Sequence, residues 1–198
     1  MQPIILASQS PRRKQLLEWA EVPFEVITQT TEETFPSDMQ VIDVPVHIAL
    51  QKALVVKAYV QEAYHGIHAK QPVLAADTIV VLDNLVIGKP KDRADAIQIL
   101  TSLAGKHHQV ITGVVIITQE KTISFADVTD VEFHPLTQEE IIFYIDKYKP
   151  YDKAGAYAIQ EWIGVIGIKE IKGDFYNVMG LPISRVVQEL KKMDELQP

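Results

Sequence analysis

The sequence of 198 residues contains no cysteine, so disulfide bonds and thiolate metal sites are excluded. No apolar run approaches the roughly 20 residues that a membrane-spanning helix needs. The chain enters an apolar strand pattern at Ile4, without the basic region and long apolar region of a secretory signal. We therefore expect a cytoplasmic protein with no membrane partner.

Positive charge is also scarce. Lysine and arginine total 19 against 26 acidic residues, which gives a net charge of −7. Non-specific binding to a nucleic-acid backbone requires a basic face, so we expect no nucleic-acid partner. This net charge is still compatible with a binding site in which a few local cations hold a small anion. Arg12 and Arg13 are adjacent near the N-terminus and could contribute to such a site.

The composition, with 47% hydrophobic and 23% charged residues, is that of a globular protein. Without an internal repeat or linker, residues 1–198 are expected to form a single domain. Periodicity predicts strands over 4–7, 22–27, 73–82, 85–87, 110–118, 122–133 and 163–171. It predicts helices over 11–20, 43–64, 92–103, 137–148 and 182–193. Mixed elements with hairpins predict an α/β fold with a mixed sheet and flanking helices.

The first candidate site lies where the first predicted strand meets a helix. Ser10 is a suitable N-cap and Pro11 suits the first helical position. Free backbone N–H groups and the helix dipole favour an anion there, and Ser8, Arg12 and Arg13 add donors. Basic residues in a first turn oppose the dipole, which is a reason to suspect a bound polyphosphate. The alternative is an ordinary capped helix with exposed basic residues.

Asp77 is the sharpest single signal, because apolar residues flank it on both sides within a predicted strand. A buried carboxylate is usually paired, metal-bound or protonated, because burying it unpaired is costly. It is either a general base or metal ligand, or a structural aspartate bonded to backbone amides at a strand kink.

Oxygen ligands for a metal are offered by Glu32 and Glu33 in a polar loop. Paired carboxylates can bind Mg²⁺ with waters completing its coordination, although a solvated acidic loop is equally compatible. His107 and His108 are adjacent in a strand pattern, so their side chains should point to opposite faces and cannot chelate one metal together.

Three further polar residues suit a nucleotide by type. Lys89 follows Gly88 and can reach a phosphate, although this pattern alone favours an exposed turn lysine. Lys52 lies on a long predicted helix, where an exposed position is expected. Gln160 ends a segment of small residues, and its amide can both donate to and accept from a base edge. These residues alone favour a surface loop there.

Taken in chain order, these segments resemble the Maf family of nucleoside triphosphate pyrophosphatases. The resemblance covers nearly the whole chain. It is carried by LASQSPRRK at 6–14, ADT at 76–78, GKPKD at 88–92, DKAGAY at 152–157 with Ile159 and Gln160, and VMGLP at 178–182.

The resemblance implies a fold similar to inosine triphosphate pyrophosphatase, with two lobes around a central cleft, and a homodimer. It implies a Mg²⁺- or Mn²⁺-dependent hydrolysis between the α- and β-phosphates of a nucleoside triphosphate. Asp77 would then be the proton acceptor and a metal ligand. The residues that would bind phosphates and metal are Ser8, Arg13, Glu32 or Glu33, Lys52 and Lys89.

Three positions match those that separate substrate subgroups of the family, namely Arg12, Thr78 and Gln160. As they stand here, they resemble the dTTP/UTP subgroup. Ala158 departs from the usual glycine and is tolerable only if its φ is negative. Glu161 and Trp162 replace a more glycine-rich turn. The alternatives are a non-catalytic nucleotide-binding regulator of cell division or septum formation, and a purine-directed pyrophosphatase of the inosine triphosphate type.

Overall fold

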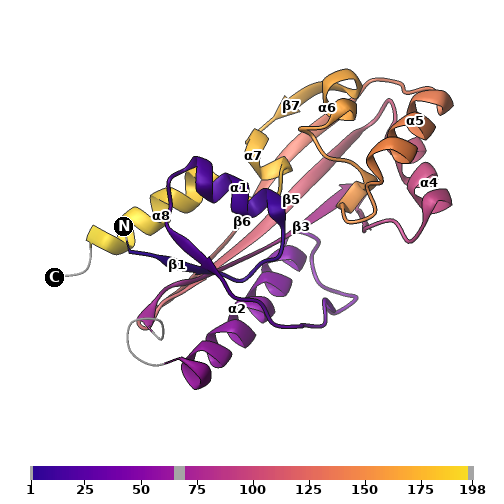
Figure 1. The fold of residues 1–198 in the computed structure, drawn as a ribbon. Coiled ribbons are helices and arrows are strands. Elements are labelled where there is room, and N and C mark those ends of the chain that lie inside the picture. Colours follow the sequence, from indigo (N-terminus) through magenta and orange to yellow (C-terminus); the bar gives the residue numbers. More distant parts are fainter. Residues whose placement is uncertain (1, 65–69, 196–198) are drawn as a thin grey trace. The chain divides into compact units, whose positions relative to one another are not determined.

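The computed structural model describes residues 2–64 and 70–195 (Figure 1). The chain divides into two compact units. The first unit comprises residues 1–77, 112–127 and 180–198, and the second comprises residues 78–111 and 128–179. Each unit has a hydrophobic core of its own.

Within residues 2–64 and 70–195, seven strands form one sheet, in the order β2-β1-β3-β5-β6-β7, with β4 paired to β3. Strand β1 pairs in parallel with β2 and β3, whereas β4 and β7 run antiparallel to β3 and β6. The predicted mixed sheet is therefore confirmed. The strands are β1 (Ile4–Leu6), β2 (Phe24–Val26), β3 (Val73–Leu82), β4 (Leu85–Ile87), β5 (His107–Ile117), β6 (Thr122–Phe133) and β7 (Ile168–Lys172).

Helices flank the sheet, as predicted, and none of those in the described residues is long and apolar enough to cross a membrane. In the part of the chain that the structure describes, the α-helices are α1 (Pro11–Trp19), α2 (Val44–Ala63), α4 (Arg93–Leu103), α5 (Gln138–Tyr148), α6 (Trp162–Gly167), α7 (Phe175–Val178) and α8 (Ile183–Glu195). A 3₁₀ turn, η1, spans Ala154–Ala156.

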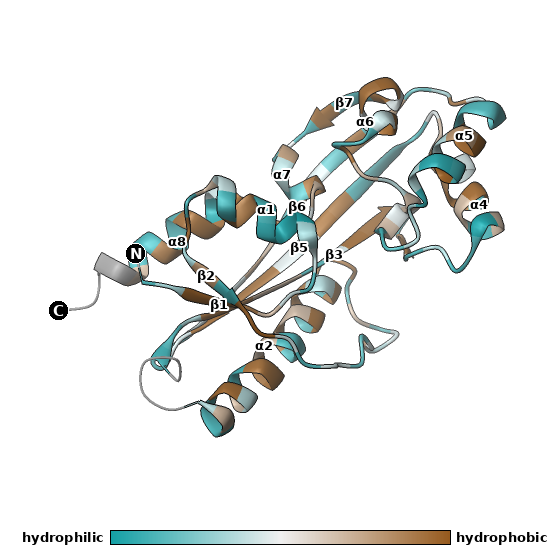
Figure 2. Ribbon diagram, viewed as in Figure 1, coloured by the Kyte–Doolittle hydropathy of each residue, from teal (hydrophilic) through white to brown (hydrophobic). Residues whose placement is uncertain are grey.

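The core of the first unit lies where α2 covers one face of the sheet. Alternate residues of β1, β3 and β5, such as Ile5, Val73 and Val115, pack against Ala53 and Val56 of α2. Figure 2 shows hydrophobic and hydrophilic residues alternating along α2, as expected for a helix with one buried face. In Figure 1, α1 and α8 lie on the other side of β1. Side chains of intervening strand residues point to that side.

The core of the second unit is formed by α4 and α5 packing against the strands. Leu100 and Leu103 of α4 and Ile141 of α5 are buried together with Phe133 of β6. Thr137 begins α5 with the predicted capping box, in which its hydroxyl accepts from the backbone of the third helical residue. The cap and the apolar face thus fix the start and orientation of this helix.

The strand predicted over 163–171 is wrong in its first half, because residues Trp162–Gly167 form α6 and only Ile168–Lys172 form β7. The β-branched residues of this segment favoured a strand by type. Packing decides otherwise: a Cβ on Gly164 would lie 1.7 Å from the Ile159 carbonyl oxygen, so the turn depends on glycine at that contact. Ile163 and Gly167, four residues apart, form the buried face of the helix.

Candidate active site

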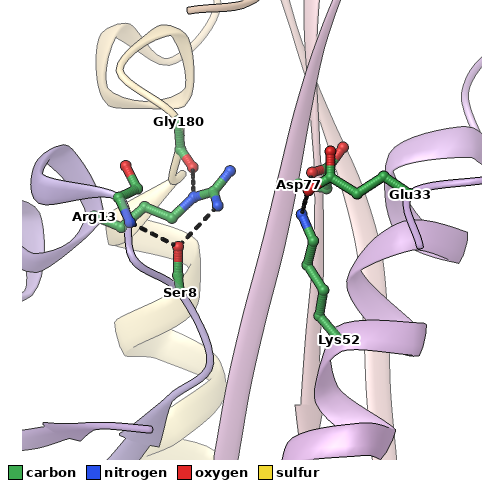
Figure 3. Close-up of polar contacts among 7 residues, drawn as sticks. Ser8, Arg13, Glu33, Lys52, Asp77 and Gly180 are labelled. Atoms are coloured by element: carbon green, nitrogen blue, oxygen red, sulfur yellow. Dashed lines mark hydrogen bonds and ion pairs between the residues drawn. The ribbon is translucent and has the colours of Figure 1, made fainter. Parts of the chain in front are cut away.

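The turn from β1 into α1 holds a buried guanidinium group. Nε of Arg13 donates to the Gly180 carbonyl oxygen across 2.8 Å, and NH1 donates to Oγ of Ser8 across 3.1 Å (Figure 3). Ser10 is the N-cap residue of α1, as predicted, but its side chain makes no capping hydrogen bond to the described first turn. Its backbone N–H instead donates to the Ser8 hydroxyl across 3.3 Å. Ser8 therefore links the turn to Arg13, and Arg13 links the turn to the chain before α8.

Burial and neighbouring charges shift the pKa of Arg13 in opposite directions. Burial lowers its pKa, and so does the neighbouring charge of Arg12, whereas the carboxylates of Asp77 and Glu33 raise it. A guanidinium group keeps its charge under such conditions. The first unit thus places a fixed cation within electrostatic range of two carboxylates.

Those two carboxylates meet on Lys52 of α2. Its Nζ lies 2.7 Å from Oδ1 of Asp77 and 2.7 Å from Oε1 of Glu33 (Figure 3). The side chains of Lys52 and Asp77 are 17% and 14% exposed, so the expectation of a solvated lysine at this position is wrong. The partner of Asp77 is a lysine side chain. A structural aspartate that bonds backbone amides at a strand kink would not require such a partner, so the pairing favours the functional interpretation. Glu33, rather than Glu32, is the loop carboxylate that joins this cluster.

The cluster has the donor types that a magnesium ion prefers. One oxygen of Asp77 and one of Glu33 already converge on a single cation, the ammonium group of Lys52. Among the described residues, no group of three or more His, Asp and Glu side chains could hold a metal by itself. Mg²⁺ is commonly bound by one or two carboxylates, with substrate phosphates and waters completing its coordination. The residues present therefore fit Mg²⁺ held jointly with a phosphorylated ligand.

The second unit carries three more of the predicted site residues, whereas Arg12 is partly buried in the first turn of α1, in the first unit. Thr78 follows Asp77 directly in β3, so the two side chains leave the strand on opposite faces. Lys89 is exposed in the turn after β4, and Gln160 is exposed just before α6. The Gly155 N–H donates to the Gly88 carbonyl oxygen across 3.1 Å, so the segment that precedes Gln160 is bonded to the turn that carries Lys89.

The small-residue segment before Gln160 has two residues with positive φ, Gly155 at 70° and Ala156 at 58°. A Cβ on Gly155 would lie 2.8 Å from a methyl group of Val80, so glycine is required there by both backbone and space. Within this described segment, Ala158 does not have a positive φ. The condition under which alanine is acceptable at position 158 is therefore met.

The two histidines lie on opposite faces of β5, as predicted. His107 is exposed, whereas His108 is buried and shares a 2.7 Å hydrogen bond from Nε2 with the Tyr157 hydroxyl. Burial, with a smaller contribution from His107, lowers the pKa of His108 to about 4. Burial raises the pKa of Tyr157, so its hydroxyl stays protonated. These residues anchor the segment before Gln160 to the strand.

Two comparisons of the sequence identify the family, and a comparison of the structure agrees with the fold. The family described as Maf-like protein matches residues 3–193. A dTTP/UTP pyrophosphatase of Bacteroides thetaiotaomicron is 49% identical over 194 residues, covering 96% of this chain and 95% of the relative. One of Bacillus mycoides is 48% identical, covering 98% and 97%. The solved structure of the Staphylococcus aureus Ham1 protein covers 98% of this chain and 100% of its own, with a TM-score of 0.51 and 16% identity, and supports the fold alone.

Proposed function

The chain belongs to the Maf family, and from that premise we propose that it hydrolyses dTTP and UTP to the nucleoside monophosphate and pyrophosphate. The observation that carries this proposal is the position of Asp77. It is a largely buried carboxylate that contacts Lys52 and lies within electrostatic range of Arg13. A polyphosphate needs such cations, and attack by water needs a proton acceptor.

In this proposal Asp77 accepts the proton of the attacking water at a carboxylate oxygen. Lys52 fixes the orientation of that carboxylate through its 2.7 Å contact. The new bond forms between the water oxygen and the α-phosphorus, while the bond from that phosphorus to the bridging oxygen breaks and pyrophosphate leaves. A general base of this kind contributes about 10²- to 10⁴-fold in rate.

Cationic groups neutralise the charge that develops on the phosphate oxygens. Arg13 is restrained by Ser8 and Gly180, so its charge needs no reorganisation when the substrate reacts. Lys89 is proposed to bind phosphate oxygens as well. Mg²⁺, bound with Asp77 and Glu33, would supply further charge neutralisation and polarisation of the phosphate.

Base selection is assigned to Arg12, Thr78 and Gln160. The Gln160 amide offers both a donor and an acceptor, which matches the O4 and N3–H groups of uracil and thymine. Cytosine presents a donor and an acceptor in the reverse order at these positions. The proposed preference is therefore for UTP and dTTP over CTP.

The test is pyrophosphate release from a panel of nucleoside triphosphates with Mg²⁺ or Mn²⁺, and with EDTA as the control. Metal-dependent release confined to UTP, dTTP and close analogues is the expected result. Release mainly from ITP or XTP would replace the base assignment with that of a purine-directed enzyme. Saturable binding of UTP without release would instead support a non-catalytic regulator.

A further inference from the structure

Hydrogen bonds to helix α5 hold the segment from Asp152 to Glu161 on both sides of Gln160. Tyr144 of α5 is fully buried, and its ring stacks on that of Tyr148, with ring centres 5.1 Å apart. Its hydroxyl accepts from the Ala158 backbone N–H across 3.2 Å and donates to a carboxylate oxygen of Glu161. One hydroxyl group therefore bridges the residues two before and one after Gln160.

The Glu161 carboxylate is held from a second direction. Nζ of the buried Lys153 lies 3.6 Å from its Oε1, and the same Nζ donates to Oδ1 of Asp152 across 2.8 Å. The ammonium group thus ties the end of the segment back to its beginning. Within a partly buried network, hydrogen bonds of this kind strengthen one another and restrict the backbone to one arrangement.

Gln160 itself is exposed, although its neighbours Ala158 and Ile159 are buried. The Ile159 carbonyl oxygen lies against Gly164 of α6, which adds a further restraint next to Gln160. The polar side chain is therefore presented to solvent by a backbone that is fixed on either side. A rigid backbone with one outward amide is the arrangement that selective hydrogen bonding to a ligand requires.

We propose that Tyr144 and Glu161 are positioning residues that set the base preference by fixing the backbone that presents Gln160. This inference rests on the proposed function, because it concerns how the same enzyme distinguishes UTP from CTP. Neither residue needs to touch the nucleotide. Their effect is transmitted through the hydrogen bonds to the backbone of Ala158 and to Lys153.

The experiment compares kcat and KM for UTP and CTP in the wild-type protein and four variants. Tyr144→Phe removes the bridging hydroxyl and keeps the stacked ring, and Glu161→Ala removes the acceptor. Tyr148→Phe is the matched control on the same helix, since no hydrogen bond to its hydroxyl is found among the described residues. Inhibition by inorganic tripolyphosphate reports separately on phosphate binding.

We expect Tyr144→Phe and Glu161→Ala to lower the UTP-to-CTP ratio of kcat/KM by about 10- to 100-fold, mainly through a higher KM for UTP. Inhibition by tripolyphosphate should stay within about twofold of wild type, as no phosphate-binding residue is changed. Glu161→Gln keeps an acceptor for Tyr144 and should recover part of the ratio. Tyr148→Phe should leave the ratio unchanged.

An unchanged ratio in Glu161→Ala, or an equal fall in Tyr148→Phe, would overturn the inference. Glu161 is only partly buried, so its variants provide the answer even if Tyr144→Phe does not fold. A wild-type protein that releases no pyrophosphate from any nucleotide would overturn the proposed function, and the inference with it. A wild type that prefers UTP, with variants that keep that preference, would overturn the inference alone.

Discussion

Nζ of Lys52 lies 2.7 Å from Oδ1 of Asp77, which joins helix α2 to strand β3 through two largely buried side chains. The same Nζ contacts Glu33 at an equal distance, so one ammonium group orients two carboxylates. The lysine thereby limits how the Asp77 carboxylate can turn. It also marks the point at which carboxylate oxygens of Asp77 and Glu33 converge on positive charge.

Asp77→Asn should lower kcat for UTP by about 10²- to 10⁴-fold, because an amide cannot accept the proton of the attacking water. The side chain keeps its size and an oxygen for Lys52, so the fold should be retained. Steady-state kinetics in saturating Mg²⁺ measure the effect. Asp83→Asn is the matched control, since Asp83 is exposed in the turn after β3 with φ 51°, which asparagine adopts readily. Near-full turnover in Asp77→Asn would refute the assignment of this base.

Lys52→Met should lower the free energy of unfolding by about 1–3 kcal/mol in the absence of metal, because Asp77 loses its donor while still largely buried. Millimolar Mg²⁺ should restore part of this loss, since the Asp77 and Glu33 carboxylates no longer share the Lys52 ammonium group and attract a divalent ion, and a ligand of the folded state stabilises it. Urea denaturation with and without Mg²⁺ provides the measurement.

Lys121→Met is the control for Lys52→Met, as Lys121 is exposed in the turn before β6. Its stability and its response to Mg²⁺ should match those of the wild type. If Mg²⁺ stabilises Lys52→Met no more than the wild type, the two carboxylates do not form a metal site.

Most elements could be predicted from the sequence because local signals agreed with packing. The dense apolar run gave the bounds of β3, and the Thr137 capping box gave the start of α5. The region of α6 was different, because its β-branched residues favour a strand while Gly164 packs against the Ile159 carbonyl. That contact joins residues on either side of a turn, and no local propensity encodes it.

Some residues of the candidate site could likewise be predicted from the sequence, and others could not. Asp77 stands out in the sequence because a carboxylate interrupts an apolar strand, and Arg13 because it follows a capped helix start. Lys52 does not stand out, because its partner Asp77 lies 25 positions along the chain. The same holds for the Gly180 carbonyl, which meets Arg13 across 167 positions. Tertiary structure alone identifies such partners.

Gly164→Ala should destabilise the protein by at least about 1–3 kcal/mol, because its new methyl group would lie 1.7 Å from the Ile159 carbonyl oxygen. Gly88→Ala is the matched control, as a Cβ there would have no heavy atom within 4 Å. Its stability should remain within about 0.5 kcal/mol of wild type. Thermal unfolding followed by circular dichroism compares the two. Equal melting temperatures would show that the turn before α6 is not packed as described.

His108 should make stability depend on pH below neutrality. Its pKa is lowered by burial to about 4, whereas the unfolded chain takes up the proton near 6.5, so the unfolded state binds more protons between these values. Stability is then full above pH 6.5 and declines as the pH falls towards 4, by up to about 3 kcal/mol.

His108→Gln should remove that part of the decline, because glutamine does not titrate. Urea denaturation of both proteins at pH 7 and pH 4.5 isolates the histidine from other titrating groups. The same loss of stability in the variant and the wild type would mean that His108 is not the group responsible.

The most direct test of the central claim is the identity of the products formed from UTP, followed by ³¹P NMR in the presence of Mg²⁺. Hydrolysis between the α- and β-phosphates predicts UMP and pyrophosphate as the first products, in equal amounts. Formation of UDP and inorganic phosphate would place the cleavage at the terminal phosphate and contradict the account. Unchanged UTP under conditions in which it binds would contradict it as well.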